Sequence, residues 1–143
     1  MAIVVKRVYE SPSRQDGTRV LVDRLWPRGL TKKEAALDAW LKDLAPSNEL
    51  RNWTHAHPEL WPMFRKRYLK ELAQPEAREA LQELYRLASR RKRLTLLYAF
   101  KNEEHNNAVV LKDLLDGMKK PPTGTGPASA GATRVRKAAR RPA

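Results

Sequence analysis

The sequence contains no cysteine, and this absence excludes several kinds of chemistry at once. Disulfide bonds, thiolate nucleophiles and cysteine metal sites are all ruled out. No apolar run approaches the roughly 20 residues that a membrane-spanning helix requires. The apolar stretch of the first segment, MAIVVKRVYE, is also too short for a secretory signal. We therefore expect a cytoplasmic protein with no membrane partner.

Acidic residues are scarce relative to basic ones. The chain of 143 residues has 29 Lys and Arg against 16 Asp and Glu, which gives a net charge of +13. Seven of these basic residues lie in residues 119–143, a segment rich in Pro, Gly and Ala that has no acidic residue. This composition offers too little apolar surface to offset the entropy of ordering it. We expect a single domain over residues 1–118 and a disordered basic tail over residues 119–143. The tail either contacts nucleic acid or serves only as a solubilising extension.

Apolar runs alternate with amphipathic segments over residues 1–118. Strands are expected at residues 2–9, 18–23, 38–45 and 94–100. Residues 38–45 could instead extend the preceding helix, but a strand is favoured because it completes a β–α–β unit. Helices are expected after the capping residues Thr31 and Ser47, from Pro58, from Pro75, and over residues 103–118. The pattern predicts an α/β fold, a compact three-layer domain with a small, mostly parallel sheet of about four strands flanked by helices.

Polar side chains follow the second expected strand directly. The segment RVLVDRLWPRGL places Asp23, Arg24, Trp26 and Arg28 where the strand should end. Arginine guanidinium groups suit bidentate binding of phosphate or carboxylate, and ligands of α/β folds bind at the carboxyl ends of strands. We expect an anion-binding loop in which Asp23 orients the ligand or acts as a base and Trp26 stacks on a base or sugar. Alternatively, Asp23 pairs with one of the arginines inside the fold, and Trp26 is a core residue.

A second polar segment, residues 101–107, follows the last expected strand and opens the last helix. Free backbone N–H groups at a helix start attract anions, and histidine can transfer protons near neutral pH. We expect Glu104 and His105 to have catalytic roles and Asn106 and Asn107 to bind the ligand. Helix capping by Asn102 is the alternative explanation for part of this segment. It leaves the His-Asn-Asn sequence unexplained, because asparagine is a poor helix former beyond the cap.

Patterns typical of metal and cofactor sites are missing from the sequence. His55 and His57 are separated by two positions, which is not a spacing typical of zinc ligands. Even if His105 supplied a third histidine, we expect no metal site. The sequence has no glycine-rich phosphate loop, no nucleophile elbow and no zinc-finger spacing. We therefore expect no cofactor.

Three blocks of sequence, RVLVDRLWPRGL, WLKDLAPS and TLLYAFKNEEHNNAVVL, resemble a known family. The chain is similar to the bacterial family named domain of unknown function 488, in its YeaO-like branch, over roughly residues 3–117. The resemblance implies a compact α/β domain and implies no particular reaction. Some relatives are joined to transcription regulators or lie beside them, which hints at a regulatory role. The broader family has a Cys-His-Arg motif after the last strand, whereas this chain has His105-Asn106-Asn107 and so lacks the cysteine that a thiol mechanism requires.

These observations support one leading hypothesis for function. The domain binds a small phosphate-bearing or nucleotide-like ligand at the carboxyl ends of its second and fourth strands, where Arg24, Arg28 and His105 are expected to meet in one pocket. It could be an enzyme of the hydrolase or glycosyl-transfer type, with Asp23 or Glu104 as base and His105 as acid. The alternative is a non-enzymatic accessory protein that binds nucleic acid or takes part in regulation. The sequence does not indicate an oligomeric state.

Overall fold

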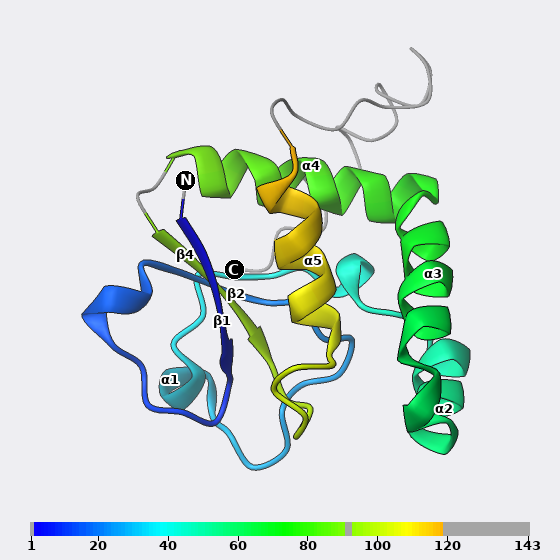
Figure 1. Cartoon of the computed structure of the whole chain (residues 1–143). Coiled ribbons are helices and arrows are strands. Elements are labelled where there is room, and N and C mark those ends of the chain that lie inside the picture. The colour runs from blue at the N-terminus through cyan, green and yellow to red at the C-terminus, as the bar shows by residue number, and fades with distance from the viewer. Residues whose placement is uncertain (1, 91–92, 119–143) are drawn as a thin grey trace.

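The computed structural model describes residues 2–90 and 93–118 (Figure 1). The basic tail that the sequence predicts at residues 119–143 lies outside the described residues, so its role stays a prediction. None of the helices in the described part of the chain is both long and apolar enough to cross a lipid bilayer.

The sheet has four strands, and every pair of neighbours is parallel. The strands are β1 (Ala2–Arg7), β2 (Thr18–Leu21), β3 (Ala39–Trp40) and β4 (Arg93–Tyr98), in the spatial order β1-β4-β2-β3. The predicted α/β class and parallel sheet are thus confirmed. Leu21 pairs with Leu97, so the chain after β2 and the chain after β4 leave the sheet at the same edge.

Within the described residues, five α-helices and three short 3-10 helices connect and cover the strands. The α-helices are α1 (Lys32–Ala35), α2 (Asn48–Ala56), α3 (Trp61–Leu72), α4 (Pro75–Arg90) and α5 (Asn107–Asp116). The 3-10 helices are η1 (Arg14–Asp16), η2 (Lys42–Leu44) and η3 (Pro58–Leu60). The expected helix caps are present: the Thr31 hydroxyl accepts from the Glu34 N–H, and the Ser47 hydroxyl accepts from the Leu50 N–H.

Two predicted elements differ most from those in the structure. Residues 38–45 form a strand of only two residues, because the chain turns into η2 directly after Leu41. The last helix begins at Asn107 instead of Glu103, because the Asn106 side chain accepts the N–H of Val109 and so fixes the cap at residue 106.

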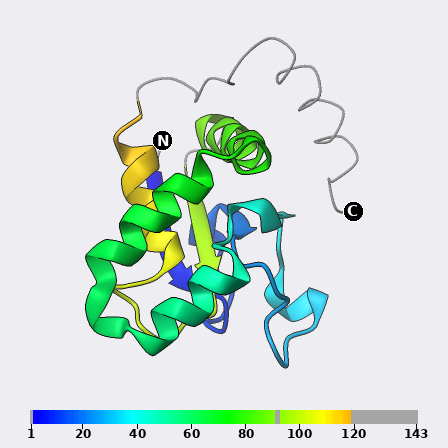
Figure 2. The ribbon, with the colours of Figure 1, turned by 90° about the vertical axis from the view of Figure 1, so that its right-hand side faces the viewer.

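The main hydrophobic core lies between one face of the sheet and helices α2 to α5 (Figure 2). Alternate strand residues face this layer, and they are Ile3, Val20, Val22, Leu94, Leu96 and Tyr98. The helices contribute apolar stripes at helical spacing, such as Phe64, Tyr68 and Leu72 of α3. The sheet thus packs on a thick helical layer, and α2, α3 and α5 of this layer each bring residues to the carboxyl edge of the strands.

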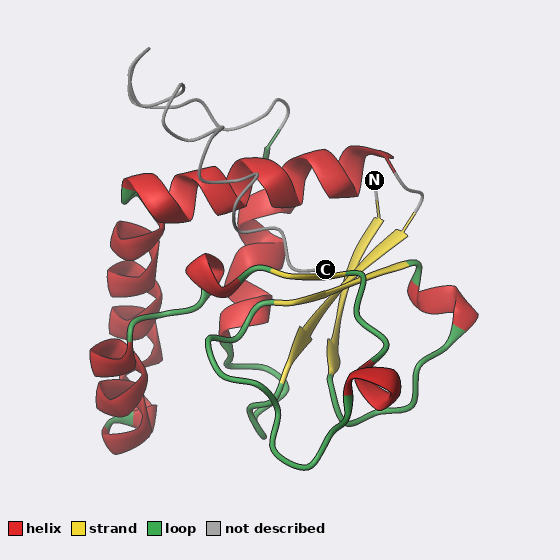
Figure 3. Ribbon diagram, turned by 180° about the vertical axis from the view of Figure 1, so that it is seen from behind, coloured by secondary structure: helices red, strands yellow, loops and turns green. Residues whose placement is uncertain are grey.

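The opposite face has a thinner cover, made by α1 and the loops on either side of it (Figure 3). Its apolar part is a small cluster centred on Val8, Leu21 and Leu97. Its polar part is a buried ionic group in which the Asp16 carboxylate pairs with Lys6 at 3.1 Å and with Arg19. The Arg19 guanidinium also donates to the carbonyls of the last residues of α1, which fixes this helix to the sheet. The predicted three-layer arrangement is confirmed, with two unequal outer layers.

Candidate functional site

A pocket of about 350 Å³ opens at the carboxyl edge of β2 and β4. The two polar segments that the sequence singles out both line it, together with parts of α2 and α3. Seven of the eight residues predicted for the site lie along its wall, and they are Asp23, Arg24, Trp26, Arg28, His105, Asn106 and Asn107. A volume of this size is typical of sites for small molecules. The expected meeting of Arg24, Arg28 and His105 in one pocket is therefore what the structure shows.

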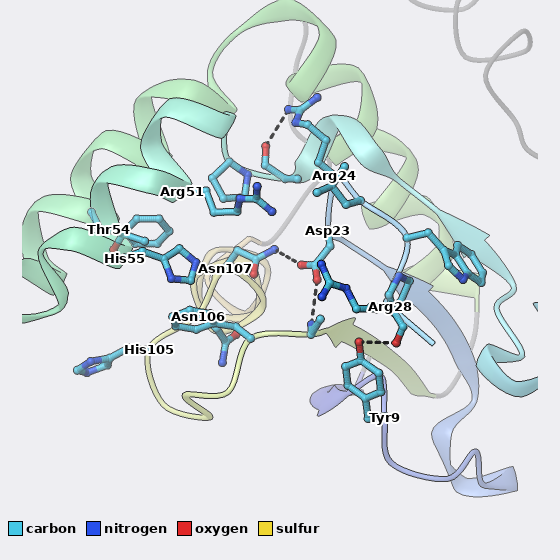
Figure 4. Close-up of a pocket in the computed structure, with 18 of the residues that line it drawn as sticks. Tyr9, Asp23, Arg24, Arg28, Arg51, Thr54, His55, His105, Asn106 and Asn107 are labelled. Carbon is cyan, nitrogen blue, oxygen red and sulfur yellow. Dashed lines mark hydrogen bonds between the residues drawn. The ribbon is translucent and has the colours of Figure 1, made fainter. Parts of the chain in front are cut away.

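Asp23 forms the inner wall of the pocket at the end of β2. Its Oδ2 accepts the backbone N–H of Ala99 at 2.9 Å, and its Oδ1 accepts the side-chain amide of Asn107 at 3.2 Å (Figure 4). Burial raises the pKa of the Asp23 carboxyl, although these two hydrogen bonds and the charge of Arg51 partly oppose the rise. Asp23 is therefore a held carboxylate that takes up a proton more readily than an exposed aspartate.

Asn106 and Asn107 have separate structural duties at the start of α5. Asn106 is the N-cap, and its amide also donates to the carbonyl of Asn102 at 2.9 Å. Asn107 is buried and donates to the Val22 carbonyl at 2.9 Å as well as to Asp23. The His-Asn-Asn sequence is thus explained by capping one turn later than expected, followed by a buried link to β2.

Tyr68 of α3 is fully buried next to Asn107 and does not itself line the pocket. Its hydroxyl donates to the carbonyl of Leu44. Burial raises the pKa of Tyr68 well above its usual value, and the negative charges of Asp23 and Glu71 add to the rise. The sequence places Tyr68 in the apolar stripe of this helix, and the structure confirms it as a residue of the main core.

Three arginines approach the pocket, and none pairs with Asp23 in the described part of the chain. Arg24 donates to the Ala45 carbonyl at 3.3 Å, and its buried Nε has no hydrogen-bond partner among the described residues. Arg28 is exposed, while its backbone carbonyl accepts the hydroxyl of Tyr9 at 3.0 Å. Arg51, which comes from α2, was not predicted. The suggested internal pair between Asp23 and Arg24 or Arg28 is not present.

Helix α2 contributes a polar face that sequence reasoning missed. Arg51, Thr54 and His55 all line the pocket. They stand at positions i, i+3 and i+4, the spacing that places side chains on one face of a helix. The same helix has Leu50 and Trp53 packed on the core. This combination of one polar and one apolar face was the signal available in the sequence, but nothing in it indicates which partner the polar face meets.

The proposed acid and base are not brought together. Glu104 is exposed and does not line the pocket, and its backbone N–H donates to the Asn102 side chain at 2.9 Å. The ring of His105 stacks on Trp61, with the ring centres 4.5 Å apart and the planes 8° apart. Figure 4 shows His105 at one edge of the pocket residues, apart from Asp23, which lies near their centre. The arrangement therefore has no base–histidine pair within hydrogen-bonding reach.

Trp26 and the histidines are held by aromatic contacts. The Trp26 ring packs edge-on against Trp40, and its Nε1 donates to the Leu30 carbonyl at 2.6 Å. His55 meets Phe100 and His57 stacks on Trp53, so each histidine contacts a different aromatic ring. Within residues 2–90 and 93–118 no group of three or more His, Asp or Glu side chains is placed to hold a metal ion.

Comparison with known proteins gives a consistent family match. The model of a family described as the inactive DUF488-N3 subclade matches residues 2–130. The uncharacterized protein YeaO of Escherichia coli (strain K12) is 49% identical over 120 residues, which cover 82% of this chain and 100% of that protein. The uncharacterized protein Rv3073c of Mycobacterium tuberculosis (strain ATCC 25618 / H37Rv) is 43% identical over 113 residues, which cover 79% of this chain and 92% of that protein. No solved structure matches the chain significantly.

Proposed function

The chain belongs to the DUF488 family, as its sequence motifs indicate, and from this premise we propose that its pocket binds a small anionic ligand without reacting with it. The matched subclade is described as inactive. The chain has no cysteine, and His105 stacks on Trp61 at a distance from Asp23. Together these observations favour a binding protein over the hydrolase or glycosyl-transfer enzyme considered from the sequence.

The observation that carries the proposal is the charge of the pocket. Arg24, Arg28 and Arg51 approach it, and Asp23 is the single carboxylate that the described residues place on its wall. The Arg24 Nε–H is buried without an acceptor among the described residues, and an unsatisfied donor of this kind costs about 1–3 kcal/mol. The pocket is thus prepared for negative charge before a ligand arrives.

The rest of the wall suits a ligand with an apolar part. Trp61, Phe64 and Phe100 line the pocket beside the arginines. Guanidinium forks match phosphate oxygens in geometry, and the aromatic side chains, with Trp61 already stacked against His105 and Phe64, offer apolar contact to the rest of the ligand. The best-fitting class is therefore a phosphate-bearing, nucleotide-like molecule of modest size.

A thermal-shift titration tests the proposal with three probes: inorganic phosphate, adenosine monophosphate and adenosine. A ligand at 100 times its dissociation constant stabilises the folded state by about 2.7 kcal/mol, so binding will raise the melting temperature measurably. We expect the monophosphate to bind best and adenosine to bind least. No shift with any of the three probes would contradict the proposal.

A matched pair of variants assigns the binding to the pocket. Arg51→Gln removes one pocket cation, and Arg65→Gln removes an exposed cation of α3 that does not line the pocket. Loss of a charge-assisted contact costs roughly 1.5–3 kcal/mol, so we expect Arg51→Gln to weaken monophosphate binding about tenfold or more. Arg65→Gln should leave it unchanged. Equal effects would place the bound anion elsewhere.

A further inference from the structure

The outward face of α3 carries a cluster of cations that the pocket does not use. The cluster consists of Lys66, Arg67 and Lys70, and all three are exposed. The segment from Leu60 to Lys70 has no acidic residue. The acidic side chain that follows, Glu71, is bound to Ser47 through the backbone N–H at 2.8 Å and the hydroxyl at 2.6 Å. The α3 cluster is therefore not neutralised from its own helix.

No other element of the described fold neutralises it either. Within residues 2–90 and 93–118, no member of the α3 cluster forms an ion pair with a carboxylate. The buried side of α3 holds Phe64, Tyr68 and Leu72, so Lys66 and Lys70 stand one turn apart on the side away from the core. Figures 1 and 3 show α3 running along one side of the molecule. The cluster is thus open to a partner along its length.

One member of the cluster is held in place by aromatic side chains. The guanidinium of Arg67 lies over the ring of Trp53, 4.4 Å from its centre. The same ring stacks on His57, with ring centres 5.0 Å apart. This ordering lowers the entropy that Arg67 loses when it binds an anion. The Trp53 ring is thus already in contact with both Arg67 and His57.

We propose that the α3 cluster is a surface for the phosphate backbone of double-stranded nucleic acid, bound without regard to base sequence. Adjacent exposed cations that pair with no carboxylate of the described fold suit a row of phosphates, and binding releases condensed counterions. The net charge of +13 favours the approach of a polyanion. This surface is separate from the pocket, because Lys66, Arg67 and Lys70 do not line it.

The aromatic contacts favour a duplex over a single strand. Proteins that bind single strands stack bases on free aromatic side chains. The large apolar side chains exposed in the described part of the chain are Tyr9, Leu25 and Met63, and only Met63 belongs to α3. With Trp53 occupied, the cluster offers charge and no stacking surface. We therefore expect it to bind a duplex better than a single strand of the same length.

Fluorescence anisotropy with a labelled DNA duplex of arbitrary sequence tests this surface in the full chain. Affinity is measured at several salt concentrations for the natural protein and for the variant Lys66→Gln/Arg67→Gln/Lys70→Gln. Each phosphate contact contributes about 0.9 to the slope of log affinity against log salt, so three lost contacts should reduce the slope by about 2.7. Failure of the natural protein to bind at low salt would overturn the proposal.

The matched control removes the same charge from the opposite side of the sheet. Arg14→Gln/Lys32→Gln/Lys33→Gln changes three exposed residues of η1 and α1. This control retains the α3 cluster and the basic residues 119–143, so its salt slope should stay close to that of the natural protein. Equal slopes for the two triple variants would show that α3 is not the binding surface.

Two further measurements protect the interpretation. The double variant Lys66→Gln/Lys70→Gln keeps Arg67 on Trp53, and a slope reduced by about 1.8 is expected if the fold is unchanged.

A single strand of equal length should bind the natural protein more weakly than the duplex. Tighter binding of the single strand would refute the preference for a duplex. Adenosine monophosphate binding is expected to stay normal in the α3 variants, which separates this surface from the pocket.

Discussion

Asp23 and Asn107 are hydrogen-bonded to each other although 84 residues separate them in the chain. The Asn107 amide donates to the Asp23 carboxylate at 3.2 Å and to the Val22 carbonyl at 2.9 Å. This one side chain joins the first turn of α5 to the end of β2. It thereby fixes the two segments that make the inner wall of the pocket.

Asn107→Ala should destabilise the fold and loosen the pocket. The change leaves the buried Val22 carbonyl without this donor, and an unsatisfied buried group costs about 1–3 kcal/mol. Urea unfolding measures the loss. Asn102→Ala is the control, because Asn102 is exposed and its side chain accepts only the N–H groups of Glu104 and His105 in a local turn. Similar losses in both variants would contradict the role given to Asn107.

The raised pKa of Asp23 predicts how its contribution to stability depends on pH. A group whose pKa is higher in the folded than in the unfolded state binds its proton more tightly when folded. Its stabilising contribution is present below the unfolded value of 3.8 and is lost as pH rises through the folded value. We expect the free energy of unfolding of the natural protein to fall relative to Asp23→Asn as pH rises above 3.8. A rise over the same range would show that the carboxylate is held in its charged form.

Asp16 should show the opposite dependence. Burial alone would raise its pKa, but the Ser13 N–H and the neighbouring Lys6 and Arg19 lower it overall. Its contribution is therefore present above 3.8 and is lost as pH falls through the lower folded value.

Asp16→Asn should accordingly cost about 3–5 kcal/mol at neutral pH, because it leaves Lys6 and Arg19 without their carboxylate. Asp116→Asn, which breaks the more exposed pair with Lys112, should cost at most about 1 kcal/mol. Chemical denaturation at neutral pH compares the two, and equal costs would argue against a stabilising role for the buried ionic group.

Gly17 and Gly29 offer a controlled test of close backbone packing. Both have positive φ, 66° and 84°, so alanine strains the backbone at either position. A Cβ on Gly17 would lie 2.2 Å from the carbonyl oxygen of Arg93, whereas a Cβ on Gly29 would meet nothing within 4 Å. Strain alone costs roughly 1–3 kcal/mol. We expect Gly17→Ala to lower the melting temperature clearly more than Gly29→Ala, and equal melting temperatures would show that β4 can move away from the turn.

The fold was largely predictable because its elements carry local signals. Apolar runs at β1, β2 and β4, and the caps at Thr31 and Ser47, were each readable within a few residues. The start of α5 was not, because Asn102 and Asn106 both offer a capping side chain and the sequence does not say which one the helix uses. Asn102 instead closes the turn that precedes the helix. Its side chain accepts the N–H of Glu104, and its backbone carbonyl accepts from the side-chain amide of Asn106.

The candidate site was predictable only where it follows strands. Asp23, Arg24 and Arg28 come directly after β2, and the parallel sheet brings them to residues 105–107. Arg51 was missed because its place depends on how α2 docks against the sheet, which no local pattern encodes. The stacking of His105 on Trp61 is likewise a long-range contact, and it moves the imidazole away from the role first expected for it.

The strand order also has a consequence for how the protein is made. β4 lies between β1 and β2, so the first strand to leave the ribosome has no partner until residues 93–98 have followed it. β1 and β2 do not pair with each other, and each pairs with β4 over its length. Contacts that span so much of the chain form slowly compared with local ones. A nascent chain that lacks residues 93–98 therefore has β1 without a partner strand, and β1 joins the rest of the sheet only after β4 has been made.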